Sequence, residues 1–210
     1  MQSDAIAGAI LGCAVGDAMG LPYEGLSRRR GVRLLGDPSR HRFIVGHGMV
    51  SDDTEHTCMV AVALCEHPRD VNAFARTFAW HLRIWLLGLP AGVGFATLRA
   101  IVKLWLGFSP ARSGVFSAGN GPAMRSAILG AAIDDVGDLS RFVRSATLIT
   151  HTDPKAFEGA LAVALAAWCA RRGLHQPAQF LALFRKTADK HASHEFLALL
   201  RSVEQSVAKR

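Results

Sequence analysis

Residues 49–57 form the part of the sequence that is best equipped to do chemistry. Two adjacent carboxylates, Asp52 and Asp53, stand between the hydroxyl groups of Ser51 and Thr54, where an apolar helical pattern begins. Asp and Ser at a helix start usually accept hydrogen bonds from the free N–H groups of the first turn. Several oxygen donors in a row exceed what one cap needs, and hard cations such as Mg²⁺ prefer oxygen ligands. The segment is therefore either an acidic helix cap or part of a cation site.

A glycine-rich helix end, residues 12–20, precedes a second candidate, the carboxylate of Glu24. Glycines let the backbone approach a ligand closely, and a carboxylate on the following loop could act as acid, base or metal ligand. The same residues also fit a glycine helix cap followed by an exposed glutamate. Gly16 and Gly20 have the spacing of small residues at helix contacts, and this interpretation needs no function.

The third candidate is the loop Gly119-Asn120-Gly121, which precedes Met124 and Arg125. Two glycines before a helix free backbone N–H groups to face an anion, and the helix dipole adds to the attraction. Arg125 could add further donors to the same anion. The alternative is a flexible loop in which Asn120 caps the helix.

The fourth candidate is His151, which ends one predicted helix just before the pair Asp153-Pro154 begins the next. A neutral imidazole at this place could stack on a base or ribose, or donate to a phosphate. The alternative is a histidine that interacts with the helix dipole.

Nearly all of the chain that must position these residues has helical periodicity. Asp70, Gly88 and Pro90 delimit one helix, and Pro fits the first turn of the helix that Asp153 opens. No run shows sustained alternation of period two, so the sequence predicts an all-α fold with residues 27–50 as its longest irregular stretch. The predicted helices cover residues 5–15, 54–66, 71–87, 95–106, 122–133, 138–150, 155–171, 177–188 and 194–208.

Length and composition predict one globular domain over residues 1–210, because half of the 210 residues are apolar. The formal net charge is +7, but no aromatic interleaving or zinc pattern accompanies it, so nucleic acid is not expected as a partner. The basic residues gather in two segments, one with Arg28, Arg29, Arg30, Arg33, Arg40 and Arg42, the other with Arg171, Arg172, Arg185, Lys186 and Lys190.

The cysteine and hydropathy patterns predict a cytoplasmic protein without a membrane span. The four cysteines form no Cys-x-x-Cys pair, and Cys13, Cys58 and Cys65 lie in apolar patterns typical of core residues. The N-terminus carries no basic region of a signal peptide. Charged residues interrupt the apolar stretch 74–89, which is too short to span a bilayer.

Taken in order, these motifs resemble the ADP-ribosylglycohydrolase family, which includes the dinitrogenase reductase-activating glycohydrolases. The resemblance runs from about residue 5 to residue 171. The motifs that carry it are Gly16-Asp17-Ala18-Met19-Gly20 with Glu24, Ser51-Asp52-Asp53-Thr54, Gly119-Asn120-Gly121 with Met124-Arg125, and Thr150-His151 with Asp153-Pro154.

The resemblance implies a compact, orthogonal multi-helix all-α domain with two bound metal ions, usually Mg²⁺ and sometimes Mn²⁺. It implies hydrolysis of the bond at C1″ of ADP-ribose in an ADP-ribosylated protein or small ADP-ribosyl compound. By the same resemblance, Ser51, Asp52 and Asp53 are metal ligands, and Glu24 and Asp53 are catalytic. The implied substrate-binding residues are Gly119, Asn120, Gly121, Met124 and His151.

The sequence departs from the family pattern in its C-terminal part. The family closes its metal site with a late Asp-x-Asp-Thr motif, and no such motif follows His151. We therefore expect a domain that is incomplete at the C-terminus, an incomplete second metal site and little activity of this chain alone. A complementing C-terminal segment is then a candidate partner. The competing hypotheses are a non-catalytic ADP-ribose-binding module and an inactive structural remnant.

Overall fold

A computed structural model describes residues 2–90, 92–188 and 193–207. These residues form helices and loops without a strand, apart from one isolated bridge between Val115 and His151, so the all-α prediction is confirmed. The helices are α1 (Gln2–Gly20), α2 (Arg28–Leu35), α3 (Asp52–Glu66), α4 (Val71–Leu87), α5 (Phe95–Trp105), α6 (Pro110–Ser113), α7 (Gly121–Met124), α8 (Ala127–Ala132), α9 (Val136–Leu148), α10 (Pro154–Arg171), α11 (Pro177–Ala188) and α12 (His194–Val207), with short 3₁₀ helices η1 (Leu21–Tyr23) and η2 (Ile44–Gly46). Asp189 and Lys190, and Ala208 at the predicted end of the last helix, lie outside the described residues.

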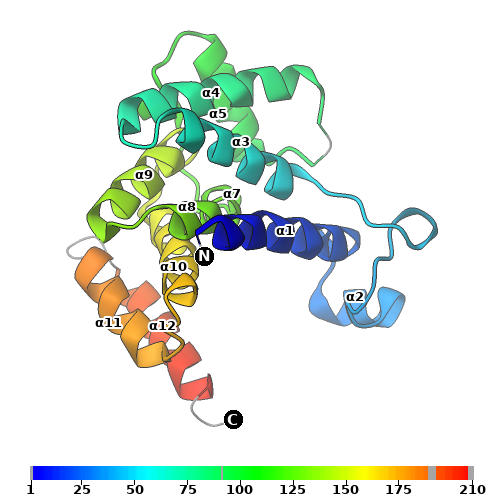
Figure 1. The fold of residues 1–210 in the computed structure, drawn as a ribbon. Helices are drawn as coiled ribbons and strands as arrows, with labels where there is room; N and C mark the ends of the chain where they lie inside the picture. Colours follow the sequence, from blue (N-terminus) through cyan, green and yellow to red (C-terminus); the bar gives the residue numbers. More distant parts are fainter. Residues whose placement is uncertain (1, 91, 189–192, 208–210) are drawn as a thin grey trace.

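One cluster of buried apolar side chains joins most of the helices. In Figure 1, α3, α4 and α5 lie together at one end, α8, α9 and α10 occupy the middle, and α11 and α12 lie at the other end. Helices α8 and α10 lie in close contact, since a Cβ atom on Gly130 would lie 1.9 Å from the carbonyl oxygen of Ala164. The largest buried members of the cluster are Phe74, Phe78, Phe142, Phe184, Leu82, Ile101, Leu104, Ile128, Leu129, Leu139 and Ile149.

Capping residues set several helix starts as the sequence predicted. The Asp70 carboxylate accepts from the N–H groups of Asn72 and Ala73, and the Asp153 carboxylate accepts from the N–H of Lys155. Helix α4 has the predicted bounds, because its N-cap, its apolar face and the glycine at its end, Gly88, all indicate the same first and last residues. Helix α9 begins earlier than predicted, because Asp135 and not Asp138 is its N-cap.

Two parts of the helix prediction are wrong. The stretch 27–50 is not wholly irregular, because Ser27 accepts a hydrogen bond from the N–H of Arg30 and caps α2. The helix predicted over 122–133 is divided into α7 and α8 by a turn at Arg125 and Ser126. There the Ser126 hydroxyl donates to the carbonyl oxygen of Pro122.

The predicted core role of the α3 cysteines is also wrong. Cys58 and Cys65 are exposed, and Cys13 is half-buried. Helix α3 instead buries Val60, Ala63 and Leu64, which lie on the same face of the helix as the buried His56. Helical spacing alone does not show which of two small-residue faces is covered.

Helix α1 leaves one face uncovered. The glycines at positions 8, 12, 16 and 20 would each have open space around an added Cβ atom, so their spacing does not serve a helix contact within the described residues. Leu11 and Val15 are exposed on the same helix, whereas Ala18 is buried. The stretch Ser3–Tyr23 is long and apolar enough to cross a membrane by length and composition, a test that core helices and signal sequences also pass.

The two C-terminal helices differ in how well their apolar side chains are covered. Leu181 and Phe184 of α11 are buried, and Phe196 and Leu200 of α12 pack against the same cluster. Leu199 and Val203 of α12 are exposed, and further exposed apolar side chains lie on other helices, among them Leu11, Val15, Trp80, Ile84, Leu87, Phe95, Val102, Trp105 and Leu106.

Candidate functional site

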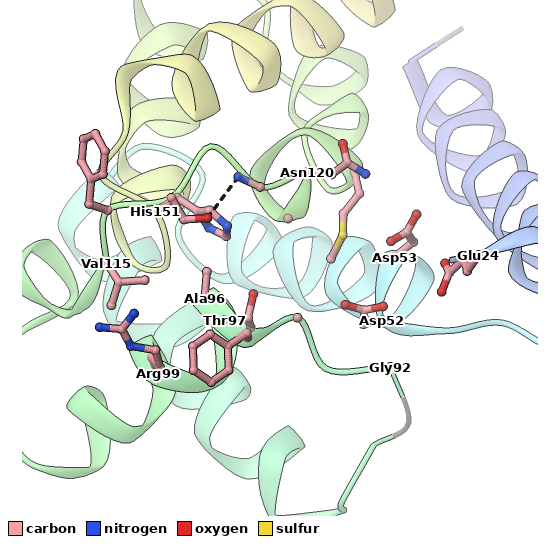
Figure 2. A pocket seen from close by; sticks show the side chains of 17 residues that line it. Glu24, Asp52, Asp53, Gly92, Ala96, Thr97, Arg99, Val115, Asn120 and His151 are labelled. Carbon is pink, nitrogen blue, oxygen red and sulfur yellow. Dashed lines mark hydrogen bonds between the residues drawn. The ribbon is translucent and has the colours of Figure 1, made fainter. Parts of the chain in front are cut away.

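A pocket of about 490 Å³ brings together residues that lie far apart in the sequence. Figure 2 shows Glu24, Asp52 and Asp53 at one end of it and His151, Val115 and Arg99 at the other. Every residue of the candidate site lines this pocket except Ser51: Glu24, Asp52, Asp53, Gly119, Asn120, Gly121, Met124 and His151. The structure thus assembles one site from the four motifs, while the role of each residue in it stays a prediction.

The carboxylate of Asp17 in α1 fixes the start of α3. Its Oδ2 accepts from the backbone N–H of Ser51 at 2.7 Å, from the N–H of Thr54 at 3.1 Å and from the Thr54 hydroxyl at 2.6 Å. Its Oδ1 accepts from the Ser51 hydroxyl at 2.7 Å. Asp17 is buried, so these four charge-assisted hydrogen bonds replace the water that the carboxylate has lost.

This arrangement overturns the interpretation of residues 51–54 as an ordinary cap. Ser51 is the N-cap residue of α3, but its side chain caps no N–H group of that helix. Its hydroxyl hydrogen goes to Asp17, and Ser51 is buried behind the pocket wall. Because Asp17 satisfies the first turn, the carboxylates of Asp52 and Asp53 are left to face the pocket.

Burial and neighbouring negative charges raise the pKa of two carboxyl groups at this end of the pocket, Asp52 and Asp53. Burial raises the pKa of Asp52 to about 6, and the negative charges of Asp53, Glu24 and Asp17 add to the effect. Burial likewise raises the pKa of Asp53, followed by the charges of Asp17 and Glu24. A cluster of this kind favours the binding of a proton or a cation.

The loop 119–121 lies directly on the ring of His151. A Cβ atom on Gly119 would lie 2.9 Å from His151 Nε2, and one on Gly121 would lie 3.0 Å from Cε1. Glycines at these two positions therefore let the loop backbone touch the imidazole. Two backbone hydrogen bonds join Val115 to the residues on either side of His151. The Thr152 N–H donates to the Val115 carbonyl, and the Val115 N–H donates to the Thr150 carbonyl.

The predicted anion site at this loop is only partly present. Helix α7 is four residues long, so it lacks the dipole of the longer helix that we predicted. Within the described residues, the N–H groups of Asn120 and Gly121 have no hydrogen-bond partner, whereas the N–H of Gly119 donates to the Ser117 hydroxyl. Two backbone donors are thus available at the pocket.

Arg125 does not face the pocket, contrary to its predicted role as a ligand donor. The break between α7 and α8 turns it into the core, where it is 0% exposed. Its guanidinium lies over the ring of Phe78, 5.1 Å from the centroid. It contacts His56 and Thr150 rather than the pocket opening.

Sequence reasoning missed two contributors to the site. The first is Asp17, which we treated as part of a glycine-rich motif although an acidic residue in a small-residue helix is itself a signal. The second is the pocket wall formed by Gly92, Gly94, Thr97 and Arg99. The glycines before α5, one with φ of +78° at Gly92, were the available signal for that wall.

A metal centre is not preformed in the part of the chain that the structure describes. There, no group of three or more His, Cys, Asp or Glu residues is arranged to hold an ion. The donor chemistry of Asp52, Asp53 and Glu24 suits Mg²⁺ or Mn²⁺, but their arrangement supplies part of a coordination shell and not the whole of it.

Two known proteins are similar in sequence to most of this chain. A protein of Archaeoglobus fulgidus described only as uncharacterized is 35% identical over 167 residues, which are 76% of this chain and 53% of that protein. The ADP-ribosyl-dinitrogen reductase glycohydrolase of Rhodospirillum rubrum is 32% identical over 163 residues, 72% of this chain and 52% of that enzyme. The chain thus spans about half the length of the curated relatives it matches.

A solved structure and the family profile extend the match over the whole chain. The structure of an ADP-ribosylglycohydrolase-related protein complex superposes with a TM-score of 0.64 at 30% identity, covering 97% of this chain and 67% of that one. The sequence profile of ADP-ribosylglycohydrolases matches residues 1–210. With the same four motifs assembled in one pocket, the chain belongs to the ADP-ribosylglycohydrolase family.

Proposed function

We propose that this pocket binds ADP-ribose and that the chain takes part in hydrolysis of the glycosidic bond at C1″ of ADP-ribosylated substrates. The observation that carries the proposal is that one pocket combines the carboxylates of Glu24, Asp52 and Asp53 with the loop 119–121, where the N–H groups of Asn120 and Gly121 have no partner among the described residues. A volume of about 490 Å³ lies in the range of small-molecule sites.

The two ends suit the two parts of such a substrate. The diphosphate would lie at the loop 119–121, because the backbone N–H groups of this loop and the His151 ring supply hydrogen-bond donors. The ribose to be cleaved would lie near Asp52, Asp53 and Glu24. Cleavage at C1″ develops positive charge on the ribose ring, and a nearby carboxylate stabilises that charge or moves a proton.

Each carboxylate would have a distinct task. Asp52 and Asp53 would hold a divalent cation, with Asp53 also close to the reacting carbon. Glu24, which is exposed on the loop after η1, would exchange a proton with water. Two divalent ions, when bound, would fix the ribose hydroxyls and polarise a water molecule. Because the described residues supply only part of a coordination shell, we expect weak metal binding by this chain.

A non-catalytic ADP-ribose-binding module is the second candidate. It is favoured by the contrast between donors at Asn120, Gly121 and His151 and a carboxylate end where, among the described residues, no three His, Cys, Asp or Glu side chains are arranged to hold an ion. In this case the chain would bind the ligand and leave the bond intact. We place either form in the cytoplasm, as the four free cysteines favour.

Calorimetry with ADP-ribose, with and without Mg²⁺, tests the proposal. We expect measurable binding that Mg²⁺ strengthens, and loss of the Mg²⁺ effect in Asp52→Asn. Asp37→Asn, which changes an exposed carboxylate outside this pocket, is the matched control. An ADP-ribose affinity that is the same with and without Mg²⁺ would favour the non-catalytic module. The absence of binding at millimolar ADP-ribose would overturn both candidates.

A further inference from the structure

The buried guanidinium of Arg125 contacts His56 directly and reaches His151 through the Thr150 hydroxyl. Its Nη2 donates to the Ala146 carbonyl at 2.9 Å and to the Thr150 hydroxyl oxygen at 2.6 Å. Its Nη1 lies 3.3 Å from Nδ1 of His56. Burial lowers the pKa of Arg125 to about 9, so the group stays charged at neutral pH. A guanidinium has donors and no acceptor.

The Thr150 hydroxyl links the guanidinium of Arg125 to the ring of His151. Its oxygen lies 2.8 Å from His151 Nδ1 and accepts from Arg125. Thr150 is fully buried, and among the described residues its hydroxyl hydrogen has no acceptor other than His151 Nδ1. The hydroxyl therefore donates to Nδ1, because a buried hydroxyl hydrogen without an acceptor is costly.

The consequence appears at the other nitrogen of the ring. A neutral imidazole with an accepting Nδ1 carries its proton on Nε2. Burial lowers the pKa of His151 to about 4, so the ring is neutral near pH 7. Nε2 lies beneath Gly119 at the pocket, and no described residue accepts from it.

We propose that Arg125, acting through the Thr150 hydroxyl, holds His151 as the Nε2–H tautomer, so that the pocket presents a fixed hydrogen-bond donor to an oxygen of its ligand. Arg125 and Thr150 are then positioning residues, although neither lines the pocket. This inference rests on the proposed function only for the identity of the ligand, which we take to be ADP-ribose.

The direct contact of Arg125 with His56 supplies an internal reference. His56 Nδ1 must also accept, since Arg125 only donates, so His56 also carries its proton on Nε2, a buried atom that has no hydrogen-bond partner among the described residues. Burial lowers the pKa of His56 well below its ordinary value, and the charge of Arg125 lowers it further. A change at Thr150 should alter the tautomer of His151 and leave that of His56 unchanged.

The test is nuclear magnetic resonance of the full chain with isotope-labelled histidine at neutral pH, with His151→Gln and His56→Gln to assign the signals. In the unaltered protein we expect both rings as Nε2–H tautomers. In Thr150→Val we expect a mixed or Nδ1–H state for His151 alone, and about tenfold weaker ADP-ribose binding. Thr150→Ser keeps the hydroxyl and should resemble the unaltered protein.

Thr147→Val is the matched control. Thr147 of α9 is as buried as Thr150, which lies in the turn after that helix, but the Thr147 hydroxyl donates to the Val143 carbonyl and makes no hydrogen bond to His56 or His151. An Nδ1–H state of His151 in the unaltered protein, or an unchanged tautomer in Thr150→Val, would overturn the inference. If Thr150→Val does not fold, the spectra of the unaltered protein and Thr150→Ser still decide. Correct tautomers without ADP-ribose binding would refute the proposed function alone.

Discussion

The carboxyl group of Asp52 illustrates the conflict between stability and function at the residue scale. It faces the pocket in the company of Asp53 and Glu24, and its pKa is raised from 3.8 to about 6. A carboxyl whose pKa is raised by folding destabilises the folded state when it is ionised. The penalty is absent below about pH 4, grows between pH 4 and 6, and is complete above pH 6.

We therefore predict that Asp52→Asn stabilises the chain above pH 6 and has no effect near pH 4. The expected gain is about 1 kcal/mol, less than the full pKa shift implies, because the group is partly exposed and water screens it. Urea unfolding at pH 4 and pH 7.5 measures the difference, with Asp37→Asn as the control. A gain that is equal at both pH values would show that crowded negative charge is not its cause.

At the scale of helices, Asp17 joins α1 to α3. Four donors from Ser51 and Thr54 converge on its carboxylate, which lies in a different helix from theirs. An ordinary N-cap lies in the same chain segment as the helix it caps. Here the cap comes from a helix 34 residues away, so the direction in which Asp52 and Asp53 point depends on the packing of α1.

Asp17→Asn should therefore destabilise the protein by about 2–4 kcal/mol, since an amide cannot accept all four hydrogen bonds and places its NH₂ group against a donor. Thermal or urea unfolding measures the loss. Asp70→Asn, the same change at the N-cap of α4, should cost less because that site is open to water. Equal losses in the two variants would argue against the special role of Asp17.

Element bounds were predictable wherever local signals agreed. Helix α4 has a capping aspartate, an apolar face and a terminal glycine, and its bounds were predicted correctly. The break between α7 and α8 carries no glycine or proline at Arg125 and Ser126. It forms because Arg125 finds buried partners in other helices, His56 of α3 and the Ala146 carbonyl of α9, and local patterns do not record such partners.

At the scale of the whole molecule, the pocket has hydrogen-bond donors at the loop 119–121 and only part of a metal coordination shell at Glu24, Asp52 and Asp53. It spans about half the length of its curated relatives. We predict that the 210-residue chain hydrolyses ADP-ribosyl substrates very slowly even with Mg²⁺, because the two-metal mechanism needs bridging carboxylates that hold the ions about 3.5–4 Å apart. Chromatography of released ADP-ribose measures the rate.

Adding a C-terminal segment that carries an Asp-x-Asp-Thr motif should restore turnover, and Asp52→Ala should then abolish it. The same segment with both motif aspartates changed to asparagine is the control. Rapid Mg²⁺-dependent turnover by the chain alone would contradict the prediction and would mean that residues already present complete the site.

The sequence by itself determined the helical class, most helix positions and the four motifs, because periodicity, caps and short motifs are properties of neighbouring residues. It also identified Glu24, Asp52, Asp53 and His151 as candidates for one site. Only the tertiary structure decided which faces are covered, which is why Cys58 proved exposed. It also decided that Asp17 holds the start of α3 and that Arg125 is buried, because a polar group finds its partners across distances in the chain that no local pattern records.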